Sequence, residues 1–264
     1  MTGLPRSGTT VLAAVLEAHS RIELYFEPHN AHYKNPPEIP SSVADFRERM
    51  ARLYSQAQAP DAEVTGFKET STTPESLTWM EQAAAMAARE LPVRVFWIVR
   101  DPVHAYLSRL DGARKWWGYP DAAPSEIGFR RFLAESAVSL RRISTLYISH
   151  PGLIVSYGAL AQRPEAVLTL IMRTLGLPLE PEQLRYYERG PQRRKVMGDL
   201  KVAQNPQPLS AESVQAREEE RGQHREMFDT VAREGVHRAL FQLHDWIDRL
   251  GTSPRLPDDW RLGN

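Results

Sequence analysis

The 264-residue sequence contains no cysteine. That absence excludes a disulfide framework, a thiolate nucleophile and a zinc site built on cysteine. The sequence also lacks an excess of either charge, because 33 lysines and arginines balance 33 aspartates and glutamates. Nucleic-acid-binding proteins usually carry a net basic field, so we expect no nucleic-acid partner and only local sites for anions.

Long apolar runs are absent as well. No segment approaches the roughly 20 apolar residues of a membrane-spanning helix, and Val11–Leu16 is shorter than the apolar core of a secretory signal peptide. We therefore expect a soluble, cytoplasmic protein with no membrane partner. No Gly/Ser-rich linker, composition shift or internal repeat divides the chain, which predicts a single domain over residues 1–264.

Strand-like and helix-like segments alternate along the chain. The clearest strand is 93–99, where β-branched and aromatic residues dominate. Further strands are predicted at 22–26, 64–70 and 153–157. Helices are predicted at 11–19, 43–57, 75–90, 129–147 and 164–175. Another helix is predicted after Pro102, and one or two more within 210–250. The segments 28–42 and 112–125 are expected to be irregular. Alternation of this kind predicts an α/β fold of three layers, a central parallel sheet flanked by helices.

The segment from Gly3 to Thr10 carries the strongest functional pattern. Its two glycines have the spacing of a Walker A loop, whose backbone amides curl around a phosphate at the start of a helix. Thr9 stands where that loop has lysine, which argues against hydrolysis of ATP or GTP, and Arg6 is the cation instead. Only two residues precede Gly3, so the first strand is either very short or continues upstream of Met1.

A second anion-binding pair follows the strand at 93–99. In open parallel sheets, ligands bind beyond the carboxyl ends of the strands. Arg100 lies at that end of its strand, and Ser108 follows in the next predicted helix. The alternative is that Arg100 only pairs with Asp101. Given the loop at Gly3–Thr10, we favour phosphate binding.

Both patterns resemble motifs of the sulfotransferase family, of bacterial type, that uses 3′-phosphoadenosine 5′-phosphosulfate (PAPS). The resemblance implies a P-loop-like fold, Arg100 and Ser108 as ligands of the 3′-phosphate, and a loop that holds the 5′-phosphosulfate through Pro5, Arg6, Ser7, Gly8, Thr9 and Thr10. Segment 155–177, with its Leu-Gly-Leu turn, is similar to a structural part of the family. Segment 194–201 resembles the loop that closes over the nucleotide, and implies roles for Lys195, Gly198 and Lys201.

Sulfuryl transfer requires cations at the leaving phosphate and a base for the acceptor. Arg6 suits the first task, and Lys68, at a predicted strand end, suits that task or the orientation of the sulfuryl group. Candidate bases are Glu27, His29, His32 and Glu69. The family often places a glutamate where Glu27 stands, and this position makes Glu27 the preferred base, with His29 as its rival.

Aromatic residues on the irregular segments suggest a lid over the acceptor, formed by His32, Tyr33, Trp116, Trp117 and Tyr119. These side chains are equally compatible with simple packing. A lid of this kind would suit a bulky, partly apolar acceptor such as a phenolic or polyketide-like secondary metabolite or a glycoside.

Two other functions stay open from the sequence. One is a nucleotide-dependent phosphotransferase with a degenerate phosphate loop, although no clear acidic magnesium motif is present. The other is a non-catalytic nucleotide-binding protein. For the preferred sulfotransferase we expect PAPS as co-substrate, a small-molecule acceptor and no metal, and the oligomeric state stays open.

Overall fold

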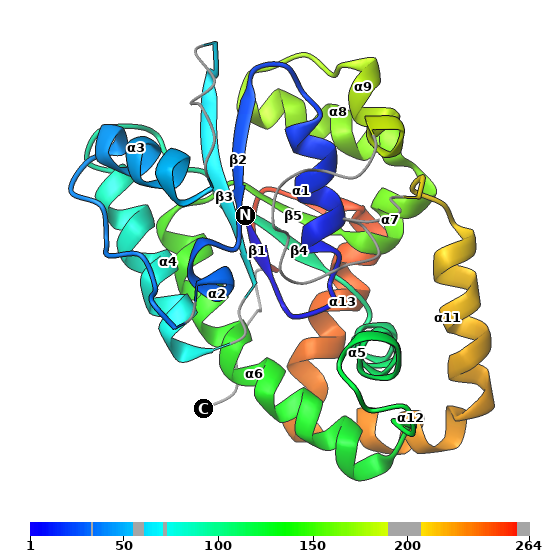
Figure 1. Ribbon diagram of the computed structural model, residues 1–264. Coiled ribbons are helices and arrows are strands. Elements are labelled where there is room, and N and C mark those ends of the chain that lie inside the picture. The colour runs from blue at the N-terminus through cyan, green and yellow to red at the C-terminus, as the bar shows by residue number, and fades with distance from the viewer. Residues whose placement is uncertain (33, 55–60, 71–72, 190–206, 258–264) are drawn as a thin grey trace.

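The computed structural model describes residues 1–32, 34–54, 61–70, 73–189 and 207–257. Within these ranges, six strands form one sheet in the order β2-β3-β1-β4-β5-β6 (Figure 1). All neighbouring strands are parallel except β5 and β6. The strands are β1 (Thr2–Gly3), β2 (Ile22–Phe26), β3 (Val64–Thr70), β4 (Phe96–Val99), β5 (Leu153–Ser156) and β6 (Thr252–Ser253). The predicted α/β fold is confirmed. The antiparallel edge strand β6 was not predicted, because two residues are too few to show a periodicity.

Helices cover both faces of the sheet. On one face, α1 (Thr9–Glu17) and α8 (Pro164–Leu175) pack on Phe96 and Ile98 of β4. On the other face, α4 (Pro74–Ala87), α6 (Glu126–Ser149) and α13 (Arg238–Leu250) pack with Trp97 and Val99. Successive side chains of a strand point to opposite faces, so one buried strand supplies both cores. The three-layer arrangement follows from this alternation.

Polar cap residues define several helix starts. The side chain of Ser42 accepts a hydrogen bond at the start of α3 (Val43–Leu53), and Thr73 forms a capping box at α4. Asp101 and Ser125 cap α5 (Pro102–Trp116) and α6. None of the described helices is long and apolar enough to cross a membrane.

The strand predicted at 93–99 is too long, because β4 starts only at Phe96. Val95 exchanges backbone hydrogen bonds with the β5 side, through His150 and Leu153. On its other side β1 reaches only Trp97 and Ile98 of β4. Residues 93–95 therefore lack the second neighbour that a central strand needs. The strand predicted at 153–157 is likewise one residue too long, since Tyr157 begins α7 (Tyr157–Gln162).

Two segments expected to be irregular contain helix. Pro28, whose fixed φ suits the first helical position, opens the short α2 (Pro28–Ala31), and α5 continues through 112–116 with the Trp117 ring packed over Gly112. Region 210–250 forms three α-helices, namely α11 (Glu212–Gln223), α12 (Arg225–Ala232) and α13. The remaining described helices are the short α9 (Pro181–Leu184), η1 (Tyr186–Arg189) and η2 (Gly235–His237).

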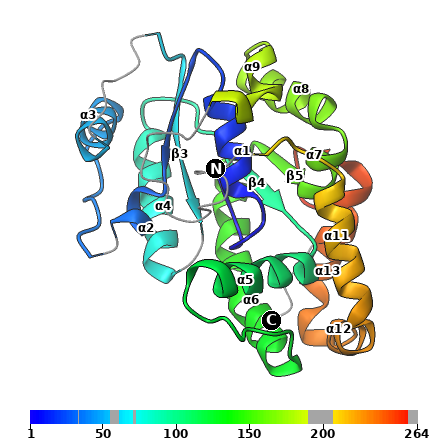
Figure 2. The same cartoon turned by 45° about the vertical axis from the view of Figure 1, so that its right-hand side comes forward.

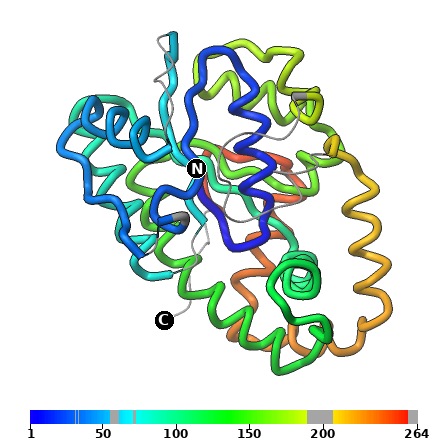
Figure 3. Tube along the Cα trace, viewed as in Figure 1, coloured from blue at the N-terminus to red at the C-terminus, as the bar shows by residue number. Residues whose placement is uncertain are grey.

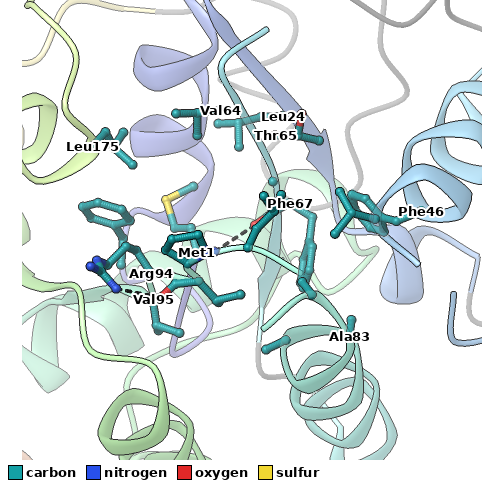
Figure 4. A pocket seen from close by; sticks show the side chains of 18 of the residues that line it. Met1, Leu24, Phe46, Val64, Thr65, Phe67, Ala83, Arg94, Val95 and Leu175 are labelled. Atoms are coloured by element: carbon teal, nitrogen blue, oxygen red, sulfur yellow. Dashed lines mark hydrogen bonds between the residues drawn. The ribbon is translucent and has the colours of Figure 1, made fainter. Parts of the chain in front are cut away.

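A cavity of about 520 Å³ lies at the amino ends of β3 and β4 (Figure 4). Val64, Phe67 and Val95 line it, and its wall is mostly apolar. Met1 and Thr2 also line it, next to the first halves of β3 and β4. The cavity therefore lies at the end of the sheet opposite to the predicted anion loop.

We predict that Gly152→Ala lowers the free energy of unfolding by about 1–3 kcal/mol, the usual cost of overpacking. A Cβ at Gly152 would lie 2.5 Å from the backbone oxygen of Val95, and backbone cannot move aside as a side chain can. Denaturant unfolding measures the loss. Gly235→Ala is the matched control, because a Cβ there meets nothing within 4 Å. Equal stability of the two variants would contradict the prediction.

Candidate functional site

The loop between β1 and α1 has the backbone of an anion-binding turn. Arg6 and Gly8 both have positive φ, of 67° and 101°, and the Ser7 amide donates to the Leu4 carbonyl at 3.1 Å. The first-turn amides of a helix have no intrahelical acceptor, and no side chain of the described residues caps α1. Figure 3 shows the chain turning after β1 and entering α1 close to α5. The amides of this loop and the positive N-terminal end of α1 together suit an anion.

Tyr157 explains why residue 8 must be glycine. A Cβ at Gly8 would lie 2.3 Å from the Tyr157 ring, which therefore packs directly against the loop. The guanidinium of Arg100 lies over the same ring, 4.4 Å from its centre. Tyr157 thus connects the loop to Arg100 from the start of α7. The sequence pointed to a strand at this position and did not indicate a site residue.

Arg6, Arg100 and Ser108 come together as predicted. Arg6 Nε donates to Ser108 Oγ at 3.2 Å, and Arg100 Nη1 donates to the Arg6 carbonyl at 3.2 Å. Both arginines approach the first turns of α5, which follows β4. The structure therefore brings the loop and the second predicted anion pair to one place.

Arg100 has no carboxylate partner among the described residues, and its Nε is buried without a hydrogen-bond partner. Burial and the repulsion of nearby Arg217 and Arg6 lower its pKa, against an opposing effect of Tyr157. Asp101, the alternative partner weighed from the sequence, instead caps α5 and pairs with Arg221 at 3.4 Å. A guanidinium in this state fits a phosphate, which would supply the missing acceptors.

A buried ion pair lies beside the loop. Lys68 Nζ donates to Glu27 Oε1, and Thr70 Oγ1 donates to the same oxygen at 2.6 Å. Glu27 is 4% exposed and Lys68 1% exposed. The parallel register places Phe26 opposite Lys68, so the residue after β2 meets the end of β3. Thr9 Oγ1 lies 3.5 Å from Thr70 Oγ1, which connects this pair to the anion loop.

Thr70 is a site residue that sequence reasoning missed. Side chains two apart on a strand share a face, so the position of Lys68 was a usable signal for Thr70. Glu69, between them, points the other way. Its Oε2 accepts from the His29 amide at 2.8 Å, while its Oε1 is buried without a partner.

Glu69 lies in surroundings that favour its protonated form. Burial, and then the charge of Glu27, raise the pKa of Glu69 to about 8. A carboxyl with that pKa is mostly protonated at neutral pH. Of the candidate bases, Glu69 is therefore the least able to accept a proton.

The two candidate histidines lie on or next to α2 and face aromatic rings. The His29 ring is 6.4 Å from the Trp79 ring, and the His32 ring is 6.0 Å from the Tyr54 ring, edge to face. Burial lowers the pKa of His29, and its Nδ1 is buried without a partner among the described residues. A neutral histidine with an unused nitrogen keeps His29 as a rival base.

Of the predicted aromatic lid, the structure brings Trp116 to the site, with its ring centre 5.9 Å from the Arg6 guanidinium carbon. Trp117 is 46% exposed and lies against Gly112, and Tyr119 is 66% exposed. Neither makes a described contact with the loop or the ion pair. Tyr33, Lys195, Gly198 and Lys201 lie outside the described residues.

No family model and no curated protein matches the chain. Among solved structures, the sulfotransferase domain from the Synechococcus PCC 7002 olefin synthase is similar, with 17% identity, a TM-score of 0.50, and 83% of this chain and 92% of that domain covered. The sulfotransferase domain from the curacin biosynthetic pathway is 17% identical, with a TM-score of 0.47, and the match covers 83% of this chain and 95% of that domain. Sulfotransferase STF9 from Mycobacterium avium is 15% identical, with a TM-score of 0.43, and the match covers 87% of this chain and 76% of that protein. The first comparison shows the sulfotransferase fold, and at this identity it shows the fold alone.

We predict that Glu69→Gln gains stability relative to the wild type as the pH rises. The folded-state pKa of about 8 lies above the ordinary value of 4.5, so the wild type loses stability between these two pH values, on the order of a few kcal/mol. Glutamine does not titrate and keeps an oxygen for the His29 amide. Melting temperatures at pH 6 and pH 9 measure the effect, with the exposed Glu219→Gln as control. A difference from wild type that is the same at both pH values would refute the assignment of Glu69.

Proposed function

We propose that the chain is a sulfotransferase that moves a sulfuryl group from PAPS to a hydroxyl, less often an amine, of a small-molecule or glycoside acceptor. One observation carries this proposal: an anion loop without the Walker lysine lies next to a buried Glu27–Lys68 pair. The same site thus offers cations for a leaving phosphate and a carboxylate for a proton. The sulfotransferase fold supports the proposal.

The donor would bind along the carboxyl ends of the strands. The loop amides, Ser7, Thr9, Thr10 and the Arg6 side chain face the 5′-phosphosulfate in this proposal. Arg100, which lacks a carboxylate partner among the described residues, and Ser108 take the 3′-phosphate. Two separate anion subsites distinguish a 3′,5′-substituted nucleotide from one with a 5′-chain alone.

The transfer step needs a proton acceptor and a stabilised leaving group. The acceptor hydroxyl gives its proton to the Glu27 carboxylate while its oxygen forms a bond to sulfur. The bond between sulfur and the bridging phosphate oxygen breaks, and its electron pair stays on that oxygen, which leaves as part of adenosine 3′,5′-bisphosphate. Arg6 and Lys68 offset the negative charge that grows on this oxygen. No redox partner is required.

Glu27 is the preferred base for a geometric reason. Its left-handed backbone, with φ of 53°, turns the chain at the end of β2 and places the carboxylate against Lys68 and Thr70. The same two groups would hold it in position while the acceptor binds. His29 lies two residues further along the chain, with its ring against Trp79.

For the acceptor we propose a chemical class. Trp116 over Arg6, and His32 near Tyr54, offer apolar ring surfaces near the ion pair. These surfaces suit a partly apolar acceptor, such as a secondary metabolite. We propose a cytoplasmic enzyme that needs no metal and has neither a nucleic-acid nor a membrane partner.

A phosphotransferase remains the competing function, and ligand binding separates it from a sulfotransferase. Calorimetry compares adenosine 3′,5′-bisphosphate without metal against ATP with Mg²⁺. Preference for the bisphosphate supports the sulfotransferase. Preference for ATP with Mg²⁺ selects the phosphotransferase, and binding of neither selects a protein of another function.

We predict that Arg100→Ala weakens binding of adenosine 3′,5′-bisphosphate by roughly 10- to 150-fold, because charge-assisted hydrogen bonds are worth about 1.5–3 kcal/mol. Arg94→Ala is the matched control, since exposed Arg94 precedes the same strand at the opposite end of the sheet. Calorimetry measures both variants. Wild-type affinity in Arg100→Ala would remove Arg100 from the 3′-phosphate site.

We also predict that Glu27→Gln lowers turnover by about 10²–10⁴-fold with little change in bisphosphate affinity, since glutamine keeps the size of the side chain but accepts no proton. With a phenolic acceptor, which is more acidic, the loss should be smaller. Bisphosphate binding also shows that the variant, whose buried Lys68 loses its partner, is folded.

His29→Ala is the companion variant, assayed at saturating donor. If Glu27→Gln keeps near wild-type turnover and His29→Ala loses it, the base is His29. If both lose turnover to a similar degree, the shape of the pH–rate profile decides, because only the true base carries the acidic limb of that profile.

A further inference from the structure

Helix α11 has no buried side chain, although it packs across α5 on the outside of the molecule (Figures 1 and 2). Charged pairs hold it there. Arg217 bonds to Asp111, Glu220 lies 3.5 Å from Arg114, and Glu218 lies 3.0 Å from His104. A helix placed by charge rather than by apolar packing has its position set by the charges of its neighbours.

Arg217 lies next to the proposed donor site. Asp111 follows Ser108 by three residues, so the two side chains lie on the same face of α5, one turn apart. Ser108 accepts from Arg6, and Asp111 pairs with Arg217. The guanidiniums of Arg6 and Arg217 are therefore bound on neighbouring turns of one helix.

The third guanidinium at this place is that of Arg100. After burial and the effect of Tyr157, the repulsion of Arg217 and then of Arg6 lowers the pKa of Arg100. Asp111 and Glu220 balance Arg217, while no described carboxylate pairs with Arg100. A phosphate monoester at Arg100 would supply the acceptors that its guanidinium lacks, and its double charge would also attract the neighbouring guanidinium of Arg217.

We propose that Arg217 is a further donor-binding residue, which contacts the 3′-phosphate together with Arg100 and Ser108, and that Asp111 positions it there. The inference rests on the proposed function, because it assigns a residue to the donor of that reaction. Arg217 then contributes to the choice of a 3′-phosphorylated nucleotide over one with a 5′-phosphate alone. Because Arg217 belongs to α11, its contact with the 3′-phosphate would also link the position of this helix to the bound donor.

Two nucleotides and three variants test the proposal. Calorimetry measures the affinity of adenosine 3′,5′-bisphosphate and of adenosine 5′-phosphate for the wild type, Arg217→Gln, Asp111→Asn and Glu218→Gln. Arg217→Gln should lose roughly tenfold or more in bisphosphate affinity and little in affinity for the 5′-phosphate. Asp111→Asn keeps the guanidinium but weakens the contact that positions it, so its bisphosphate affinity should lie between that of the wild type and that of Arg217→Gln, several fold tighter than the latter. Glu218→Gln removes an α5–α11 contact without touching Arg217 and should match the wild type.

The variants distinguish a phosphate ligand from a helix anchor. If Arg217 only attaches α11 to α5, then Asp111→Asn and Glu218→Gln weaken bisphosphate binding as much as Arg217→Gln, and the proposal is overturned. Equal losses for both nucleotides in Arg217→Gln overturn it as well. Failure of the proposed function has a different signature, since the wild type itself would then show no preference for the bisphosphate.

Discussion

The buried ion pair between Glu27 and Lys68 is the interaction on which the site depends. It joins the ends of β2 and β3, and Thr70 completes the hydrogen bonding of the carboxylate. Removing two charges from water costs several kcal/mol for each ion, and an apolar pair of the same size is often as stable. A charged pair at this depth is therefore poor evidence for stabilisation. Its place beside the anion loop favours a catalytic role instead.

The arginines beside the loop are also unfavourable for stability. Arg100 is packed between the Tyr157 ring and the loop, with two other guanidiniums near enough to lower its pKa. Repulsion of this kind opposes folding, and binding an anion relieves it. Functional sites commonly break the local rules that stabilise the rest of a protein. Here the cost is concentrated at the carboxyl ends of the strands, where ligands of parallel sheets bind.

The cavity at the amino ends of β3 and β4 shows why volume alone does not identify the site. Its lining is mostly apolar. The proposed site has the opposite character, with charged side chains and with left-handed backbone at Arg6, Gly8 and Glu27. Polar atoms that converge without partners are the more specific sign of a ligand.

The sequence by itself determined the features that depend on local chemistry. Gly8 and Arg6 defined the anion loop, the β-branched and aromatic residues before Arg100 indicated a strand, and the alternation of strands with helices predicted the fold. Tertiary structure alone decided which distant side chains meet: Tyr157 against Gly8, Thr70 on Glu27, and Arg217 on Asp111. It also decided that the pKa of Glu69 is raised, because burial and the charge of Glu27 act on this carboxyl only in the folded chain. Local patterns carry backbone preference and periodicity, whereas contact, burial and electrostatic field arise only when segments far apart in the chain pack together.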